Sequence, residues 1–125
     1  MGDYDSTAVT IRTQKGRLCQ INTTRRAAYG YDQRFEVLGS TGLLQCGNHT
    51  PTEVVQWNAA GIHADKPEAF FLQRYAAAYR LEIEHFFECL QSGAPFRTTV
   101  ADGVAAQKLA DAATLSASSG QPVVF

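Results

Sequence analysis

The densest group of polar and aromatic side chains in the sequence lies between residues 22 and 34. Within thirteen residues it supplies tyrosine hydroxyls, amides, a carboxylate and guanidinium groups, carried by Asn22, Arg25, Arg26, Tyr29, Tyr31, Asp32, Gln33 and Arg34. Such groups form the hydrogen bonds by which proteins bind polyhydroxy ligands. A second interpretation is that the arginines pair with neighbouring carboxylates at a subunit surface. The residue types alone favour neither interpretation.

The remaining residues with chemical potential form no catalytic or metal-binding pattern. His49, His63 and His85 lack the close spacing of a metal-binding pair, so structural or solvent-facing roles are predicted for them. Lys66 precedes Pro67, which is typical of a helix start, so we expect a solvated lysine there and not a catalytic acid. The sequence therefore predicts no catalytic residue and no metal ligand in this chain.

Signatures of cofactor and nucleophile sites are also absent from the sequence. The glycine-rich segment 39–42 joins two expected strands, whereas a phosphate-binding loop follows a strand and opens a helix. No Gly-x-Ser-x-Gly nucleophile motif occurs. Cys19, Cys46 and Cys89 are odd in number and far apart, which predicts buried free thiols and neither disulfides nor a zinc site. We therefore expect no cofactor-binding residue in this chain.

The composition is that of one globular domain. The chain has 125 residues, of which 45% are hydrophobic and 18% charged, and its formal net charge is −1. This charge argues against nucleic acid as a partner. No apolar run approaches the ~20 residues that a membrane span needs, and the first residues lack the features of a signal peptide. We therefore expect a cytoplasmic protein with no membrane partner.

Strands are expected in the first half of the chain. Residues 7–13 and 18–24 alternate in polarity around a Gly16 turn, which predicts a hairpin with Val9 and Ile11 on one face. The polar segment 25–33 is expected to be a loop hinged on Gly30. Further strands are predicted over residues 34–38, 43–46, 53–57 and, at the end of the chain, 122–125.

Helices are expected in the second half. Apolar residues recur every three or four positions over 68–91, which predicts one long helix that starts at Pro67. Asp102 is expected to cap a second helix that ends at residues 118–120. Strands followed by helices predict an α+β fold: an open, mostly antiparallel sheet with the long helix and the second helix on one face. The other sheet face would then meet water or a partner.

Four segments carry a family resemblance. They are Tyr4–Ala8, Asn22–Arg34, Glu36–Gly42, and Asp65–Pro67 followed by Phe70–Tyr75. These segments resemble the C-terminal domain of the inositol dehydrogenase branch of the Gfo/Idh/MocA oxidoreductase family. The run Tyr29–Arg34 is the most specific part of the match, whereas the Glu36–Gly42 turn is shared by the wider family. The resemblance extends over nearly the whole chain.

The resemblance implies a division of labour between two domains. The family has an N-terminal Rossmann domain that binds NAD(H) and carries a catalytic lysine, and a C-terminal open sheet that contacts the substrate and forms the oligomer interface. Its chemistry is reversible hydride transfer between a sugar or cyclitol hydroxyl and the nicotinamide. The family's catalytic Lys, Asp and His precede the part that matches this sequence. Residues 1–125 are therefore expected to be a single C-terminal-type domain that is inactive alone, with NAD implied only for a full-length enzyme.

The resemblance also implies which side chains meet the substrate. Tyr29 matches a tyrosine that would contact the inositol ring, and Tyr31 is its neighbour. Asn22, Arg25 and Asp32 match the surrounding pattern, where they either bind the polyol or sugar or only position the loop. Homo-oligomerisation through the open sheet face is expected. The alternatives are a free-standing, non-catalytic assembly module and a small-ligand-binding module, and the sequence leaves open whether the chain is a fragment, a truncated product or a complete protein.

Overall fold

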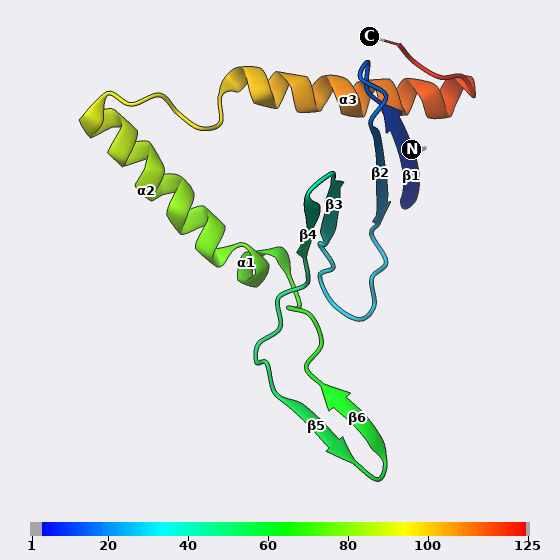
Figure 1. Cartoon of the computed structure of the whole chain (residues 1–125), viewed down its shortest axis with the longest axis vertical. Helices are drawn as coiled ribbons and strands as arrows, with labels where there is room; N and C mark the ends of the chain where they lie inside the picture. The colour runs from blue at the N-terminus through cyan, green and yellow to red at the C-terminus, as the bar shows by residue number, and fades with distance from the viewer. Residues whose placement is uncertain (1–3, 125) are drawn as a thin grey trace. The chain divides into compact units, whose positions relative to one another are not determined.

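The computed structural model describes residues 4–124 and has the strand-then-helix order that the sequence predicts (Figure 1). Its elements are β1 (Ser6–Arg12), β2 (Leu18–Thr24), β3 (Phe35–Gly39), β4 (Gly42–Cys46), β5 (Val55–Asn58), β6 (Gly61–Ala64), α1 (Phe71–Arg74), α2 (Ala76–Ser92) and α3 (Val100–Ser119). The α+β class is therefore confirmed. The strand expected over 122–125 is not formed by residues 122–124, and residue 125 lies outside the described part.

The chain divides into two compact units. The first contains the residues up to Thr7 together with Thr23–Leu81, and the second contains Ala8–Asn22 and the residues from Glu82 onward. The segment 25–34, the hairpins β3–β4 and β5–β6, and α1 all belong to the first unit. The first unit therefore contains most of the side chains that the sequence singles out.

The strands pair as hairpins. Over residues 4–124 they form three separate two-stranded sheets, β1–β2, β3–β4 and β5–β6, in place of the one open sheet expected. β3 and β4 are antiparallel, with Val37 opposite Leu44 and Leu38 opposite Leu43. In β1, burial alternates so that Val9 and Ile11 share the more buried face, as predicted. The antiparallel pairing is confirmed.

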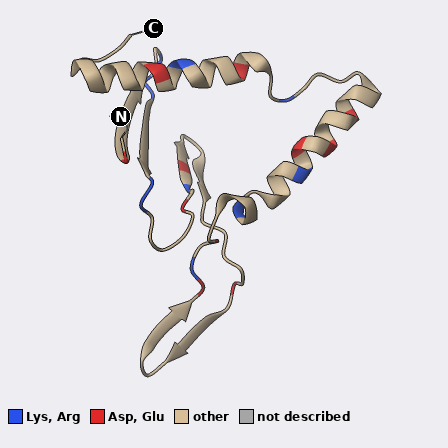
Figure 2. Ribbon diagram, turned by 180° about the vertical axis from the view of Figure 1, so that it is seen from behind, with Lys and Arg blue, Asp and Glu red and all other residues tan. Residues whose placement is uncertain are grey.

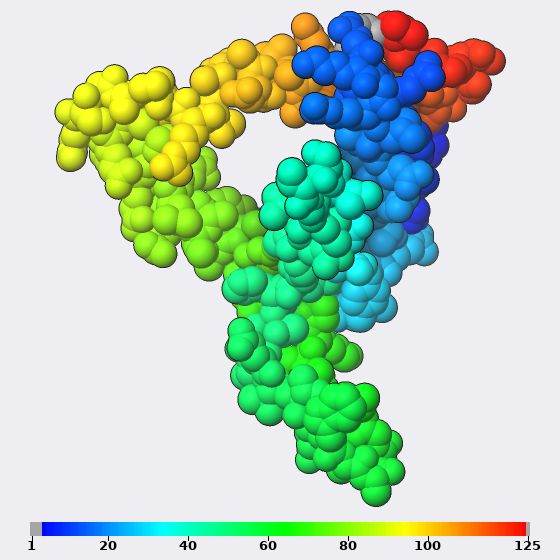
Figure 3. Space-filling view, viewed as in Figure 1, coloured from blue at the N-terminus to red at the C-terminus, as the bar shows by residue number. Residues whose placement is uncertain are grey.

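The hairpin β5–β6 contains a strand that no predicted element covers. Gly61–Ala64 pairs with β5, although no strand is predicted between residues 57 and 122. The Asn58 side chain accepts a hydrogen bond from the backbone N–H of Ala60 at 2.8 Å and closes the turn between the strands. The Asp65 carboxylate accepts two more from Thr52, at 2.9 and 2.6 Å, at the base of the hairpin. Figure 3 shows the hairpin standing clear of the rest of the first unit.

The long helix predicted over 68–91 is instead two helices, α1 and α2, separated by Tyr75. Tyr75 has φ −107° and ψ 10°, outside the helical range, while its N–H still donates to the carbonyl of Phe71 at 2.8 Å. The first helix also begins later than predicted. Both backbone groups of Glu68 are engaged elsewhere, because its N–H donates to His49 and its carbonyl accepts from Tyr31. A helix that began at Glu68 would use this carbonyl for its first backbone bond, and here the carbonyl is bonded to Tyr31.

Helix α3 begins at Val100, and its N-cap residue is Thr99 and not Asp102. The Asp102 carboxylate lies in the first turn, where it accepts hydrogen bonds from the Thr99 N–H at 2.7 Å and from the Thr99 hydroxyl at 2.8 Å. These contacts hold the pKa of Asp102 below its ordinary value. The helix ends at Gly120, whose φ of 68° is left-handed, in agreement with the predicted end.

Little of the described chain is buried. Cys89 is the one buried residue among residues 4–124, and its thiol lies 3.5 Å from Nε2 of His85. All three cysteines are free, but Cys19 is exposed and Cys46 half-buried, so the prediction of buried thiols is correct for Cys89 alone. Helices α2 and α3 each carry charges of both signs (Figure 2). Within the described residues, no helix is both long and apolar enough to cross a membrane.

Candidate functional site

The Asp32 carboxylate is the centre of a hydrogen-bonded group in the loop between β2 and β3. It accepts hydrogen bonds from Nε of Arg34 at 2.7 Å, from Nη2 of Arg34 at 2.8 Å, from Nδ2 of Asn48 at 2.7 Å and from the Tyr29 hydroxyl. We call Tyr29, Asp32, Arg34 and Asn48 the Asp32 cluster. The Arg34 hydrogen bonds, followed by those from Tyr29 and Asn48, hold the pKa of Asp32 well below its usual range. Asp32 therefore stays ionised.

Asn48 joins this loop to the turn that follows β4. Its Nδ2 donates to Asp32, while its Oδ1 accepts a hydrogen bond from the backbone N–H of Gln33 at 2.8 Å. Both ends of the amide are therefore used, and the side chain is half-buried. Sequence reasoning missed Asn48, because an asparagine in a turn is ordinary and carries no local signal of a longer-range contact.

The backbone of the loop is fixed against the segment before α1. Gly30 has φ +137°, and a Cβ atom at this position would lie 2.7 Å from the carbonyl oxygen of Pro67. The next residue, Tyr31, donates its N–H to the carbonyl of Glu68 at 2.7 Å. Gly30 thus acts as the predicted hinge, and it is also the point of closest approach between the two segments.

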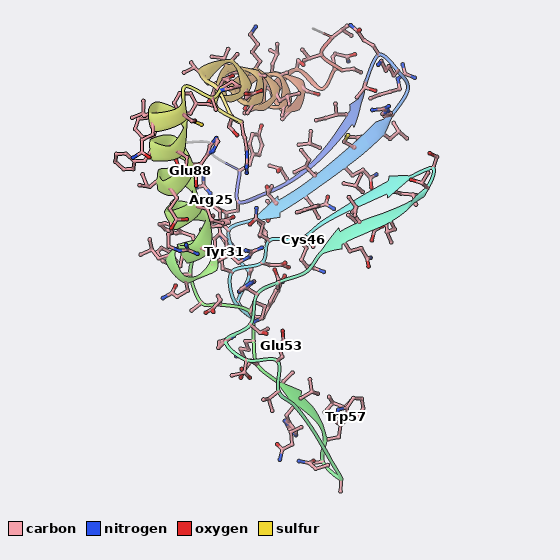
Figure 4. All side chains as sticks on the ribbon, turned by 60° about the vertical axis from the view of Figure 1, so that its left-hand side comes forward. Arg25, Tyr31, Cys46, Glu53, Trp57 and Glu88 are labelled. Carbon is pink, nitrogen blue, oxygen red and sulfur yellow. The ribbon has the colours of Figure 1, made fainter. Side chains whose placement is uncertain are left out.

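A second pair of hydroxyl groups lies at Tyr31 and Tyr75. The two rings meet edge to face with centroids 5.6 Å apart, and their hydroxyl oxygens are 3.4 Å apart. This distance is long for an O–H···O hydrogen bond, so both hydroxyls retain capacity for a ligand. The contact with Tyr31 raises the pKa of Tyr75. Figure 4 shows Tyr31 in the loop. The sequence signal for Tyr75 was its place in the motif Phe70–Tyr75.

The electrostatics of the loop suit binding better than proton transfer. The hydrogen bond to Asp32 is the main cause of a raised pKa for Tyr29, so Tyr29 stays protonated while Asp32 stays ionised. Neither group exchanges a proton near neutral pH. What the loop offers a ligand is a set of phenol and carboxylate oxygens in a fixed arrangement.

The other predicted contact residues are not members of the Asp32 cluster as defined above. Asn22 is exposed in β2 and belongs to the second unit. Arg25 is exposed, and its backbone N–H donates to the carbonyl of Asp5 at 2.9 Å. Arg26 forms an ion pair with the Asp5 carboxylate. Pairing of the arginines with carboxylates is therefore observed within the chain, at Arg26 and Arg34.

The start of α3 and the potential metal ligands of the described residues complete the survey of candidate sites. At the start of α3 the Asp102 carboxylate is bonded to the N–H and the hydroxyl of Thr99, so it places a negative charge at this helix N-terminus. Among residues 4–124, no three His, Cys, Asp or Glu side chains converge as metal ligands would.

Comparison with known proteins identifies the family of this chain. Residues 1–125 match the family model described as "Oxidoreductase family, C-terminal alpha/beta domain". The chain is 42% identical over 115 residues to inositol 2-dehydrogenase of Rhizobium meliloti (strain 1021), covering 92% of this chain and 35% of that protein. It is 39% identical to myo-inositol 2-dehydrogenase of Thermotoga maritima, covering 92% and 34%.

Solved structures give the same result. A crystal structure of a myo-inositol dehydrogenase from Corynebacterium glutamicum superposes with a TM-score of 0.88 at 43% identity, covering 95% of this chain and 36% of that one. The chain thus spans about one-third of the length of the relatives it matches. By its match over residues 1–125, the chain belongs to the Gfo/Idh/MocA oxidoreductase family and corresponds to its C-terminal α/β domain.

Proposed function

We propose that this chain is the substrate-binding and assembly domain of an NAD-dependent inositol dehydrogenase and is inactive alone. The observation that carries the proposal is the loop between β2 and β3, where an ionised carboxylate fixes a tyrosine hydroxyl. Tyr31 of the same loop meets Tyr75, between α1 and α2, and brings two further hydroxyl groups together. The names of the relatives, which are inositol and myo-inositol dehydrogenases, support a cyclitol as the ligand.

In this proposal the chain holds the polyol ring, and NAD bound elsewhere supplies the hydride acceptor. Tyr31 and Tyr75 present two oxygens 3.4 Å apart, a spacing that suits contact with neighbouring hydroxyls of one ring. Tyr29 and Asp32 contribute a second point of attachment, and Asn22 and Arg25 stay proposed contacts. Two points of attachment fix the orientation of a ring, which a hydride transfer requires.

The proposal includes assembly into a homo-oligomer through the open sheet face. Its support is the exposure of Leu38 and Leu43, which lie opposite each other on one face of β3 and β4 and are 81% and 46% exposed. Contiguous apolar surface of this kind marks interaction sites.

Three free cysteines favour a reducing compartment, and the proposal therefore places the protein in the cytoplasm.

The test is an assay of the polypeptide that carries residues 1–125, purified from its source cells with whatever sequence flanks it. We expect NAD⁺ reduction with inositols by that polypeptide and none by residues 1–125 alone. The variant Tyr29→Phe should lower kcat/KM for the polyol by about two- to tenfold, the value of one neutral hydrogen bond. NAD binding should not change.

Two results would contradict the proposal. One is a polypeptide that binds NAD but oxidises no cyclitol, and the other is an unchanged kcat/KM in Tyr29→Phe. Sub-millimolar polyol binding by residues 1–125 alone, measured by calorimetry, would favour the alternative of a free-standing ligand-binding module.

A further inference from the structure

The direction of the hydrogen bond between Tyr29 and Asp32 limits what Tyr29 offers a ligand. A phenol has one proton to donate and two lone pairs that accept. The Tyr29 proton is donated to Asp32. Asp32 is ionised, so it has no proton to return and the direction of this bond cannot reverse. The capacity that Tyr29 keeps for a ligand is therefore that of an acceptor.

Asn48 completes this arrangement from outside the loop. An amide can reach Asp32 with either its oxygen or its nitrogen, and only the nitrogen is compatible with a carboxylate acceptor. The Gln33 N–H occupies Oδ1 of Asn48 at 2.8 Å, which turns Nδ2 toward Asp32 at 2.7 Å. The orientation of Asn48 is thereby fixed by the backbone of the same loop that carries Tyr29.

We propose that Asn48 is a positioning residue that, through Asp32, fixes Tyr29 as a hydrogen-bond acceptor, so that the loop selects a ligand hydroxyl able to donate. The inference rests on the proposed function. It adds that, in one contact with the substrate, the protein accepts the hydrogen bond and the substrate donates it. It has a chemical consequence for specificity. A hydroxyl at the contacted position satisfies Tyr29, whereas a carbonyl, a fluorine or a hydrogen at that position does not.

The experiment compares myo-inositol with its monodeoxy and monofluoro analogues in the assembled dehydrogenase. Fluorine accepts hydrogen bonds weakly and cannot donate one. A fluoro analogue therefore shows whether the contact needs the ligand group to donate or to accept. At the position that meets Tyr29, we expect the fluoro and deoxy analogues to lose kcat/KM equally, by about two- to tenfold. We define discrimination as the ratio of kcat/KM for myo-inositol to kcat/KM for the analogue. In Tyr29→Phe this ratio should fall to about one.

Asn48→Asp tests the positioning role, with Asn58→Asp as the matched control. Both variants make the same chemical change and keep the Oδ1 acceptor, for Gln33 and for Ala60 respectively. Only Asn48→Asp puts a second carboxylate beside Asp32. We expect discrimination against the fluoro analogue to fall toward unity in Asn48→Asp and to equal that of the parent in Asn58→Asp. An NMR titration of the Asp32 carboxyl carbon should show a raised pKa only in Asn48→Asp.

Several outcomes would overturn the inference. They are full activity with the fluoro analogue at every position, parental discrimination in Asn48→Asp, or an Asp32 titration that Asn48→Asp leaves unchanged. Each of these leaves the turnover of myo-inositol intact, so they are distinct from failure of the proposed function. If no inositol is turned over, dissociation constants for the same compounds replace kcat/KM, and absence of binding also overturns the inference.

Discussion

At the scale of single residues, the Asp32 carboxylate determines how the loop responds to acid. Its pKa is well below the ordinary value because the folded chain surrounds it with donors, first among them Arg34. The unfolded chain therefore binds the proton more tightly than the folded chain does. The stability contributed by Asp32 is complete above the ordinary pKa of about 3.9 and is lost as the pH falls below it.

We predict that Asp32→Asn flattens the acid dependence of stability. The free energy of unfolding of the parent should fall between about pH 4 and pH 2, and the variant should lose less over that range because it has no proton to gain at this position. Urea unfolding at a series of pH values measures both slopes. Equal slopes in parent and variant would contradict the assignment of Asp32 as the acid-sensitive group.

The distance along the chain explains which site residues were predictable. Tyr29 and Asp32 are three residues apart, so one polar segment was enough to single out both. Asn48 lies sixteen residues from Asp32, in a turn whose composition suits any loop. Tyr75 is forty-four residues from Tyr31. Such pairs depend on how the elements pack, which a local pattern does not contain.

At the scale of elements, the docking of the loop against the segment before α1 depends on one glycine. Gly30 and Gly61 have almost the same backbone angle, φ +137° and +136°. An added Cβ at Gly30 would lie 2.7 Å from the Pro67 carbonyl oxygen, whereas at Gly61 it would meet nothing within 4 Å. Comparing an alanine substitution at Gly30 with one at Gly61 therefore distinguishes the cost of steric overlap from the cost of backbone strain.

We predict that Gly30→Ala destabilises the protein more than Gly61→Ala does. Both substitutions impose the strain of a left-handed alanine, roughly 1–3 kcal/mol. Gly30→Ala adds overlap with Pro67, which should cost about 1–3 kcal/mol more. Urea unfolding gives the difference between the two variants. Equal losses of stability would show that the loop does not rest on Pro67.

Local patterns predicted the type of each long element, but the ends of the elements less well. The apolar repeat runs through Tyr75 without interruption, so it gave no sign of the break between α1 and α2. The late start of α1 accompanies a long-range bond, in which the Glu68 carbonyl accepts from the Tyr31 N–H. The end of α3 was predictable because Gly120 stops a helix through its own left-handed conformation.

At the scale of the whole molecule, large apolar side chains remain exposed in the described part of the chain. Cys89 is the one buried residue in the described part of the chain, and large apolar residues on β3–β4 remain accessible. Leu38 and Leu43 are opposite each other and so share one face, with the pair Glu36 and Gln45, while Val37 and Leu44 share the other. The relatives are about three times as long as this chain. In the proposed function, a second copy of the chain covers the face that carries Leu38.

We predict that Leu38→Lys weakens the proposed homo-oligomer, whereas Val100→Lys does not. The two residues are similarly exposed, 81% and 85%, but only Leu38 lies on the sheet face proposed as the interface. Burial of a leucine is worth roughly 1.5–3 kcal/mol, and an unpaired lysine in its place would add a desolvation cost. The dissociation constant should therefore rise at least about tenfold in Leu38→Lys. Sedimentation velocity over a range of concentrations measures it, and equal behaviour of the two variants would place the interface elsewhere.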